Sequence, residues 1–104
     1  MTPSELAERL RLPNPPRLLD VREAEEHAFC ALPGSTLLPL SEIAERTEDI
    51  AGWKDAEVVV YCHHGVRSAH AIGFLRSQGF TRLSNLTGGI DRWSTDVDPA
   101  IPRY

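Results

Sequence analysis

One stretch of the sequence combines a nucleophile with groups that could activate it. Residues 58–61, Val-Val-Val-Tyr, are apolar and mostly β-branched, which predicts a buried strand ending directly before Cys62. A short loop with a glycine follows: His63, His64, Gly65, Val66, Arg67 and Ser68. Apolar residues at helical spacing then run from Ala69 to Leu75, so we expect the loop to lead into the first turn of a helix.

These surroundings favour the thiolate form of Cys62. Backbone N–H groups of a tight loop can converge on an anion, and a helix N-terminus adds partial positive charge. Arg67 adds a full positive charge. Such surroundings lower a thiol pKa from about 8.5 to between about 3.5 and 7.5. We therefore predict that Cys62 is a nucleophile; the alternative is a small buried apolar residue, the usual role of a free cysteine.

Length and composition narrow the possible functions. A chain of 104 residues can build one hydrophobic core, which predicts one domain over residues 1–104. The net charge of −4 gives no support to binding of nucleic acid or of an anionic membrane. No segment reaches transmembrane length, and the first residues lack the pattern of a signal peptide. Together with only two cysteines, these features predict a cytoplasmic protein with free thiols.

Strands and helices are expected to alternate along the chain. We predict strands at residues 17–22, 36–38, 58–61 and 80–86, and helices at 3–11, 23–29, 41–50, between Ser68 and Gly79, and at 90–94. This order implies an α/β fold, a parallel sheet with helices on both faces. Sites in such sheets form at the C-terminal ends of strands. Asp20 and Arg22 should therefore lie close to Cys62.

Three local details accompany this prediction. Thr2 and Glu5 have the spacing of a capping box around a helix that begins at Pro3. Ser41 is expected to cap the helix at 41–50, with Ile43, Ala44 and Ile50 turned inward. Residues 98–104 contain two prolines and are expected to form a tail over the surface.

Four short motifs resemble those of the rhodanese-type sulfurtransferases. Residues 62–68 are similar to the active-site loop of that family, a cysteine followed by four residues including glycine and then by arginine and serine. Residues 19–23, Leu-Asp-Val-Arg-Glu, resemble its early strand motif, and residues 32–35, Leu-Pro-Gly-Ser, its Pro-Gly turn. Residues 85–90, together with Trp93, resemble its C-terminal signature. The resemblance implies a rhodanese-like three-layer α/β sandwich in the stand-alone, single-domain form.

The resemblance also implies a reaction. Cys62 would attack the outer sulfur of a donor such as thiosulfate and become a persulfide, held by the loop N–H groups from His63 to Ser68. An acceptor such as cyanide or a thiol would then remove the sulfur, so catalysis is covalent and needs no metal or organic cofactor. The implied partners are small-molecule donors and acceptors, or a sulfur-accepting protein. The four histidines show no metal-ligand spacing.

Two alternatives stay open for the residues around the cysteine. Arg67 could bind the anionic end of the donor, or it could brace the loop through a carboxylate such as that of Asp20. His63 and His64 could orient an acceptor or share a proton, or they could simply face solvent. A thiolate that displaces sulfite needs no general base, which favours the interpretation that the two histidines simply face solvent.

The sequence departs from the family pattern before the Pro-Gly turn. Relatives carry Gly-His-Ile there, whereas this chain has Cys-Ala-Leu at residues 30–32. Cys30 could act as a second thiol toward Cys62, or it could fill a position that suits a small residue. Nothing in the sequence around it indicates activation of a thiol.

Two other functions remain alternatives to sulfur transfer. Related loops of the pattern Cys-x5-Arg bind tetrahedral oxyanions in phosphatases and arsenate reductases. Here only four residues separate Cys62 from Arg67, so the ring is smaller and suits a single sulfur atom. A non-catalytic binding module is the other alternative, but the intact cysteine loop argues against it.

Overall fold

Four strands form one parallel sheet in the computed structural model, which describes residues 1–104. The strands are β1 (Arg17–Asp20), β2 (Thr36–Leu37), β3 (Glu57–Tyr61) and β4 (Arg82–Asn85). Their order is β2-β1-β3-β4, and every neighbouring pair is parallel. From β1 the chain continues to β2 at one edge, and from β3 to β4 at the other. The order therefore reverses between β1 and β3, which is where open α/β sheets place their ligands.

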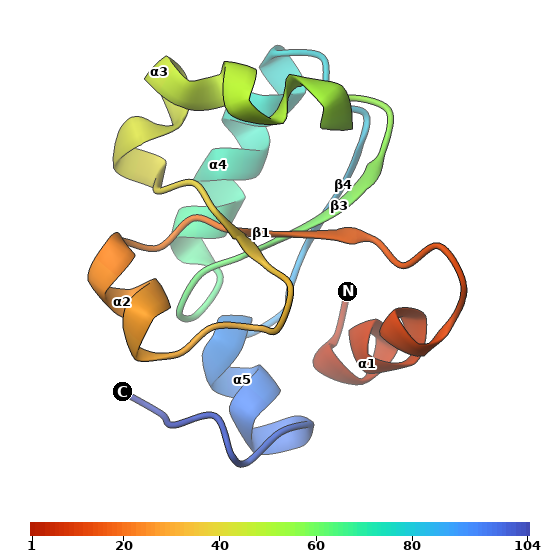
Figure 1. The fold of residues 1–104 in the computed structure, drawn as a ribbon, viewed down its shortest axis with the longest axis vertical. Helices are drawn as coiled ribbons and strands as arrows, with labels where there is room; N and C mark the ends of the chain where they lie inside the picture. The colour runs from red at the N-terminus through yellow and green to blue at the C-terminus, as the bar shows by residue number, and fades with distance from the viewer.

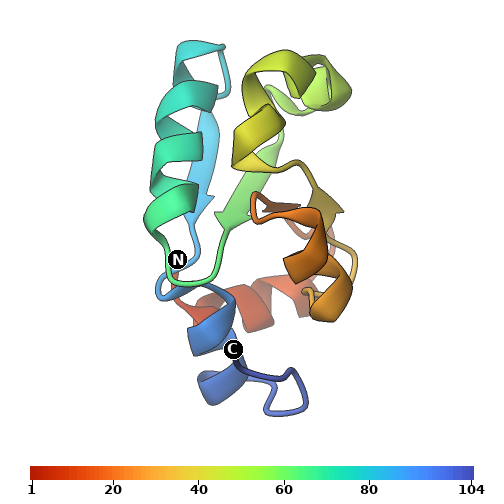
Figure 2. The same ribbon diagram turned by 90° about the vertical axis from the view of Figure 1, so that its left-hand side faces the viewer.

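Helices cover both faces of this sheet, as the sequence predicts (Figure 1). They are α1 (Pro3–Arg11), α2 (Ala24–Phe29), α3 (Ile43–Arg46), α4 (Val66–Ser77) and α5 (Gly89–Asp96), with the 3₁₀ helices η1 (Leu40–Glu42) and η2 (Thr47–Trp53). Figure 2 shows α4 lying along β3 and β4, with α1 and α5 together below the strands. No helix has the length and apolar character needed to cross a bilayer.

The alternation of side chains along β3 divides the core into two parts. Val58, Val60 and Cys62 pack into the cluster that contains residues of α3 and α4. Val59 and Tyr61 point the other way, into the cluster that contains residues of α1 and α5. Because successive side chains of a strand face opposite sides of the sheet, the alternation along β3 places the Cys62 thiol on the α4 side.

Helix α1 forms as the sequence predicts. The Glu5 backbone N–H donates to Thr2 Oγ1 at 3.2 Å, and the Thr2 N–H donates to Glu5 Oε1 at 3.0 Å. This reciprocal capping box satisfies two N–H groups that the first turn would leave unpaired. The predicted short helix with an inward Trp93 is also confirmed as α5, in which Trp93 is buried.

The predicted helix at residues 41–50 is wrong as a single element. The segment is divided into η1, one turn of α3 and η2, and Ser41 lies inside η1 and caps nothing. The Thr47 hydroxyl donates to the Ile43 carbonyl at 2.6 Å, a side-chain bond that competes with regular helix. Ile43 and Ile50 are buried as predicted, but Ala44 is exposed because α3 is a single turn.

Helix α4 begins earlier than predicted and shows a different face to the core. It starts at Val66, directly after Gly65, so part of the predicted loop is its first turn. Ser68 is buried facing the cysteine, which places Ala71, Ile72 and Leu75 inward and leaves Ala69 exposed. The inward face is therefore set by the contact with Cys62 rather than by apolar spacing alone.

The tail at residues 98–104 does more than cover the surface. Ile101 is buried in the core cluster beside α5, and the Ser94 hydroxyl donates to its carbonyl at 2.6 Å. From there the chain runs back toward α2, where Figure 1 shows its end. Tyr104 contacts the loop that follows Cys62, as described below.

Candidate active site

The sulfur of Cys62 lies against the loop and the first turn of α4. Cys62 is 1% exposed. The backbone N–H of Gly65 donates to Sγ at 3.0 Å, and that of Ser68 donates at 3.4 Å. The Ser68 hydroxyl lies 3.3 Å from Sγ and 2.6 Å from Asn85 Oδ1, so its proton can turn to either atom. Hydrogen-bond donors from one loop and one helix start thus surround the sulfur.

These donors change the acidity of the thiol. Burial of Cys62 raises its pKa, whereas hydrogen bonds from the Ser68 hydroxyl and from the N–H groups of Ser68, Gly65 and His64 lower it. The lowering is the larger effect, so the pKa lies below its usual value. The direction agrees with the expectation from the sequence.

We expect alkylation of Cys62 by iodoacetamide to titrate with a midpoint below that of a free thiol, about 8.5. A lowered pKa means that the thiolate forms at lower pH, so the rate should rise and level off earlier on the pH scale. Replacing Ser68 by alanine should move the midpoint upward, because the thiolate loses one donor. The rate is followed by mass spectrometry of the Cys62 peptide, and a wild-type midpoint at or above 8.5 would contradict the geometry.

The N-terminus of α5 fixes the backbone on which the sulfur depends. The Ile90 N–H donates to the Cys62 carbonyl at 2.9 Å, and the Asp91 N–H donates to the His63 carbonyl at 3.1 Å. The preceding Gly89 has a φ of +63° and is buried. A Cβ there would lie 2.5 Å from the Cys62 carbonyl oxygen, so only glycine lets α5 approach this closely.

Arg67 braces α2 through Glu26, a partner that no local pattern in the sequence indicates. Its guanidinium donates to Glu26 Oε1 at 2.6 Å and to Glu26 Oε2 at 2.9 Å. The suggestion that Arg67 bonds Asp20 is wrong, because the Asp20 carboxylate is already bound by Arg22. Of the two roles open to Arg67, the structure therefore shows bracing, but through α2 rather than through β1.

Asp20 and Arg22 form a buried ion pair at the end of β1. Arg22 donates from Nη2 to Asp20 Oδ2 at 2.7 Å and from Nε to Asp20 Oδ1 at 2.9 Å, and both side chains are 0% exposed. Arg22 Nη2 also donates to the Cys30 carbonyl at 2.6 Å, and Asp20 Oδ2 accepts from Tyr61 Oη at 3.2 Å. His27 Nδ1 lies 2.8 Å from the same oxygen. The pair ties β1 and β3 to the segment that follows α2.

We expect Arg22→Met to lower the free energy of unfolding by about 3–5 kcal/mol, because it leaves the Asp20 carboxylate buried without its main partner. Urea denaturation followed by circular dichroism measures this loss. Arg46→Met is the matched control, since Arg46 pairs with Glu42 and Asp49 at the exposed surface. Its loss should be much smaller. Equal losses for the two variants would show that the buried pair is not a main support of the fold.

His63 and His64 differ in their surroundings. His64 is exposed, and its Nδ1 lies 3.9 Å from Asp91 Oδ2. The His63 ring stacks on Tyr104 with centroids 3.8 Å apart and an interplanar angle of 5°. Burial, followed by the charge of His64, lowers the pKa of His63, which favours a neutral imidazole. His63 Nε2 is buried without a hydrogen-bond partner.

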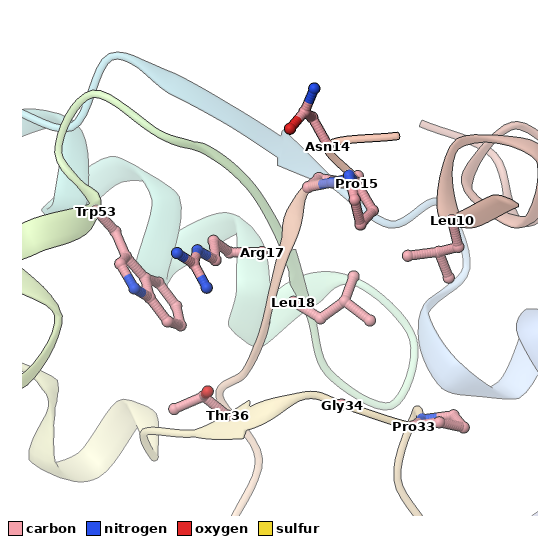
Figure 3. A pocket seen from close by; sticks show the side chains of 10 residues that line it. Leu10, Asn14, Pro15, Arg17, Leu18, Pro33, Gly34, Thr36 and Trp53 are labelled. Atoms are coloured by element: carbon pink, nitrogen blue, oxygen red, sulfur yellow. The ribbon is translucent and has the colours of Figure 1, made fainter. Parts of the chain in front are cut away.

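The largest cavity of the molecule lies away from Cys62. It has a volume of about 500 Å³ and is lined by Arg17 and Thr36, which begin β1 and β2, and by Trp53. Figure 3 shows the Arg17 side chain beside the Trp53 ring. The strands are parallel, so this cavity and Cys62 lie at opposite ends of the sheet. No three His, Cys, Asp or Glu side chains are grouped so that they could hold a metal ion.

Comparison with known proteins identifies the family. The sequence matches the rhodanese-like domain family over residues 2–96. The chain belongs to the rhodanese-like family. A sulfurtransferase of Allochromatium vinosum is 38% identical over 96 residues, which are 92% of this chain and 88% of that protein.

Two further relatives differ in how much of their own length this chain covers. The rhodanese-like/PpiC domain-containing protein 12 of Arabidopsis thaliana is 40% identical over 90 residues, which are 85% of this chain but only 30% of that protein. The structure of the human single-domain sulfurtransferase TSTD1 superimposes with a TM-score of 0.77 at 28% identity, covering 92% of this chain and 95% of that one. The rhodanese-like fold predicted from the four motifs is thus confirmed.

The rhodanese-like framework separates the two cysteines. Cys30 belongs to the core cluster that contains residues of α1 and α5, and Cys62 to the cluster on the α4 side. Both thiols are free and buried. Cys30 Sγ lies 3.6 Å from the Pro102 carbonyl. This placement supports the reading of Cys30 as a small core residue and not as a second thiol for Cys62.

Two residues of the site are absent from the sequence-based predictions. Glu26 has the spacing of a capping box with Glu23, which is a local signal, but nothing local indicates its bond to Arg67. Tyr104 lies in a tail without periodicity and reaches the site only through the fold. Both contacts join segments far apart in the chain.

Proposed function

We propose that this protein is a sulfurtransferase that carries a sulfane sulfur as a persulfide on Cys62. The observation that carries the proposal is the convergence of the Gly65 and Ser68 N–H groups on Sγ at the start of α4. Hydrogen bonds to the charged form lower a thiol pKa and so increase the fraction of nucleophilic thiolate. Membership of the rhodanese-like family and the similarity to single-domain sulfurtransferases support the same chemistry.

The proposed reaction has two displacement steps. The Cys62 thiolate attacks the outer sulfur of thiosulfate, a new S–S bond forms, and sulfite leaves with the electron pair of the broken bond. A thiophilic acceptor, cyanide or a thiol, then attacks the outer sulfur and regenerates the thiolate. The loop N–H groups from His63 to Ser68 are proposed to bind the outer sulfur. No proton transfer to Cys62 is required, so the neutral His63 needs no catalytic role.

The loop geometry disfavours the phosphatase alternative. A phosphoryl group presents three oxygens around a central atom, whereas a persulfide presents one terminal sulfur. The donors from Gly65 and Ser68 already lie within 3.4 Å of Sγ, and Arg67, which would face an oxyanion, is bound to Glu26. A binding module without catalysis would not require a thiol of lowered pKa.

The test is a comparison of activities of the wild-type protein. We expect release of thiocyanate from thiosulfate and cyanide, and no hydrolysis of p-nitrophenyl phosphate above a control without protein. Phosphate ester hydrolysis without thiocyanate release would favour the phosphatase reading. Neither activity, with a folded protein by circular dichroism, would favour the binding module.

Three accompanying proposals concern the setting of this reaction. We propose that residues 1–104 act as one domain, since both core clusters share one sheet. The sulfur donor and acceptor are small molecules or a protein that carries sulfur. The cytoplasmic location stays a prediction from the sequence.

A further inference from the structure

Arg67, in the first turn of α4, is paired with a carboxylate that the proposed reaction does not use. Glu26 lies on α2, and its side chain is 21% exposed. Both of its oxygens are occupied. Oε1 accepts from Arg67 Nη1 at 2.6 Å and from the Glu23 N–H at 3.1 Å, and Oε2 accepts from Arg67 Nη2 at 2.9 Å and from Tyr104 Oη at 2.7 Å. A carboxylate with four donors is fixed in place and ionised.

Tyr104 also holds this carboxylate. Its hydroxyl accepts from Arg22 Nη1 at 2.8 Å and donates to Glu26. Its ring stacks on His63 and meets Phe29 edge to face, with centroids 5.9 Å apart. The C-terminal tail is therefore attached both to the loop after Cys62 and to α2. The Tyr104 hydroxyl limits the positions open to the Glu26 side chain.

The ion pair with Glu26 weakens the ability of Arg67 to bind an anionic sulfur donor. A guanidinium in the first turn of α4 would be the natural partner of an anion approaching Cys62. In this structure two of its five N–H donors bond the two oxygens of Glu26, and the ion pair has no net charge. A dianion would have to displace a carboxylate that four donors retain, and it would meet the negative charge of that carboxylate on the way.

We propose that Glu26 is a specificity-determining residue that keeps Arg67 from binding dianionic donors, and that Tyr104 is the positioning residue that holds Glu26 there. This inference rests on the proposed function. The site then favours sulfane sulfur donors of lower charge, such as a monoanionic thiosulfonate or the persulfide of a thiol, over thiosulfate. The lowering of the Glu26 pKa to about 2, first by the Arg67 hydrogen bonds, keeps the carboxylate charged throughout the working range of pH.

Two sulfur donors that react in the same way but differ in charge test the effect of donor charge. Thiosulfate carries two negative charges, and methanethiosulfonate, CH₃SO₂S⁻, carries one. In both, the Cys62 thiolate attacks the outer sulfur and forms the same persulfide, and sulfite or methanesulfinate leaves with the electron pair. The measured quantity is the ratio of kcat/KM for thiosulfate to kcat/KM for methanethiosulfonate, with cyanide as the common acceptor.

We expect Glu26→Gln to raise this ratio on the order of three- to tenfold, because Arg67 gains a free positive charge that the dianion uses more. Tyr104→Phe keeps the ring on His63 and should raise the ratio in the same direction by less. Arg67→Gln leaves the carboxylate without its cation and should lower it. Glu25→Gln is the control, since it removes the same charge from an exposed position of α2 and should leave the ratio near wild type.

Each outcome decides between distinct claims. If Glu26→Gln slows both donors equally, or leaves the ratio unchanged, Glu26 only braces the loop and the inference is wrong. If Glu26→Gln does not fold, Tyr104→Phe and Arg67→Gln must still move the ratio in opposite directions, and a failure to do so has the same meaning. If the wild-type protein takes sulfur from neither donor, the proposed function itself fails and the inference falls with it.

Discussion

Replacing Gly89 by alanine should abolish sulfur transfer and destabilise the protein by about 3 kcal/mol or more. The reason is twofold. The backbone at Gly89 has a φ of +63°, which strains any residue with a Cβ. A Cβ there would also overlap the carbonyl groups of Cys62 and His63, which are backbone atoms and cannot turn aside. The start of α5 would have to move away, and the loop would lose the bonds that fix the Cys62 carbonyl.

Gly34→Ala is the matched control for this prediction. Gly34 also has a positive φ, +78°, but nothing lies within 4 Å of the position of its Cβ. Alanine there should cost only the strain of the left-handed conformation, about 1–2 kcal/mol, and should leave sulfur transfer nearly unchanged. Thermal unfolding and steady-state sulfur transfer measure both effects. Similar results for the two variants would contradict the role given to the close approach of α5.

Local sequence signals predict the part of the site that a single segment builds. The apolar strand, the cysteine and the glycine loop before a helix are contiguous, so strand–loop–helix geometry follows from their order. The placement of Asp20 and Arg22 at the end of β1 follows from parallel pairing with β3, since Asp20 pairs with Tyr61 in the register. The pattern of a single segment is thus enough to predict a site residue when the only further information needed is which strand pairs beside it in parallel.

The partners that lie far apart in sequence could not be predicted in this way. Arg67 needs an acceptor, and several carboxylates are available in the sequence. The choice of Glu26 depends on where α2 packs after β1, which no local pattern determines. The position of Asp20 at the end of β1 suggests it as the acceptor, but Arg22 already binds both of its oxygens.

Irregular segments were also beyond the reach of periodicity. The stretch after β2 has apolar residues at helical spacing, yet it forms one turn of α3 between two 3₁₀ helices. The side chain of Thr47 bonds the backbone of that turn, and such competition is not visible in an apolar pattern. Tyr104 follows two prolines and has no periodic neighbours, so its stacking on His63 appears only in the folded molecule.

Replacing Cys62 by serine should remove sulfur transfer completely, because a hydroxyl at this position cannot become a persulfide. Cys30→Ser should retain transfer, since Cys30 lies in the other core cluster. The two variants remove the same atom type from buried positions, so each controls for the other.

The intact mass of the protein after incubation with thiosulfate tests the central claim most directly. We predict one added sulfur, about 32 Da, on the wild-type protein and on Cys30→Ser, and its removal by cyanide or dithiothreitol. Cys62→Ser should gain no sulfur under the same conditions, and methanethiosulfonate should give the same pattern. An adduct that persists in Cys62→Ser and is lost in Cys30→Ser would contradict the assignment of Cys62 as the sulfur carrier.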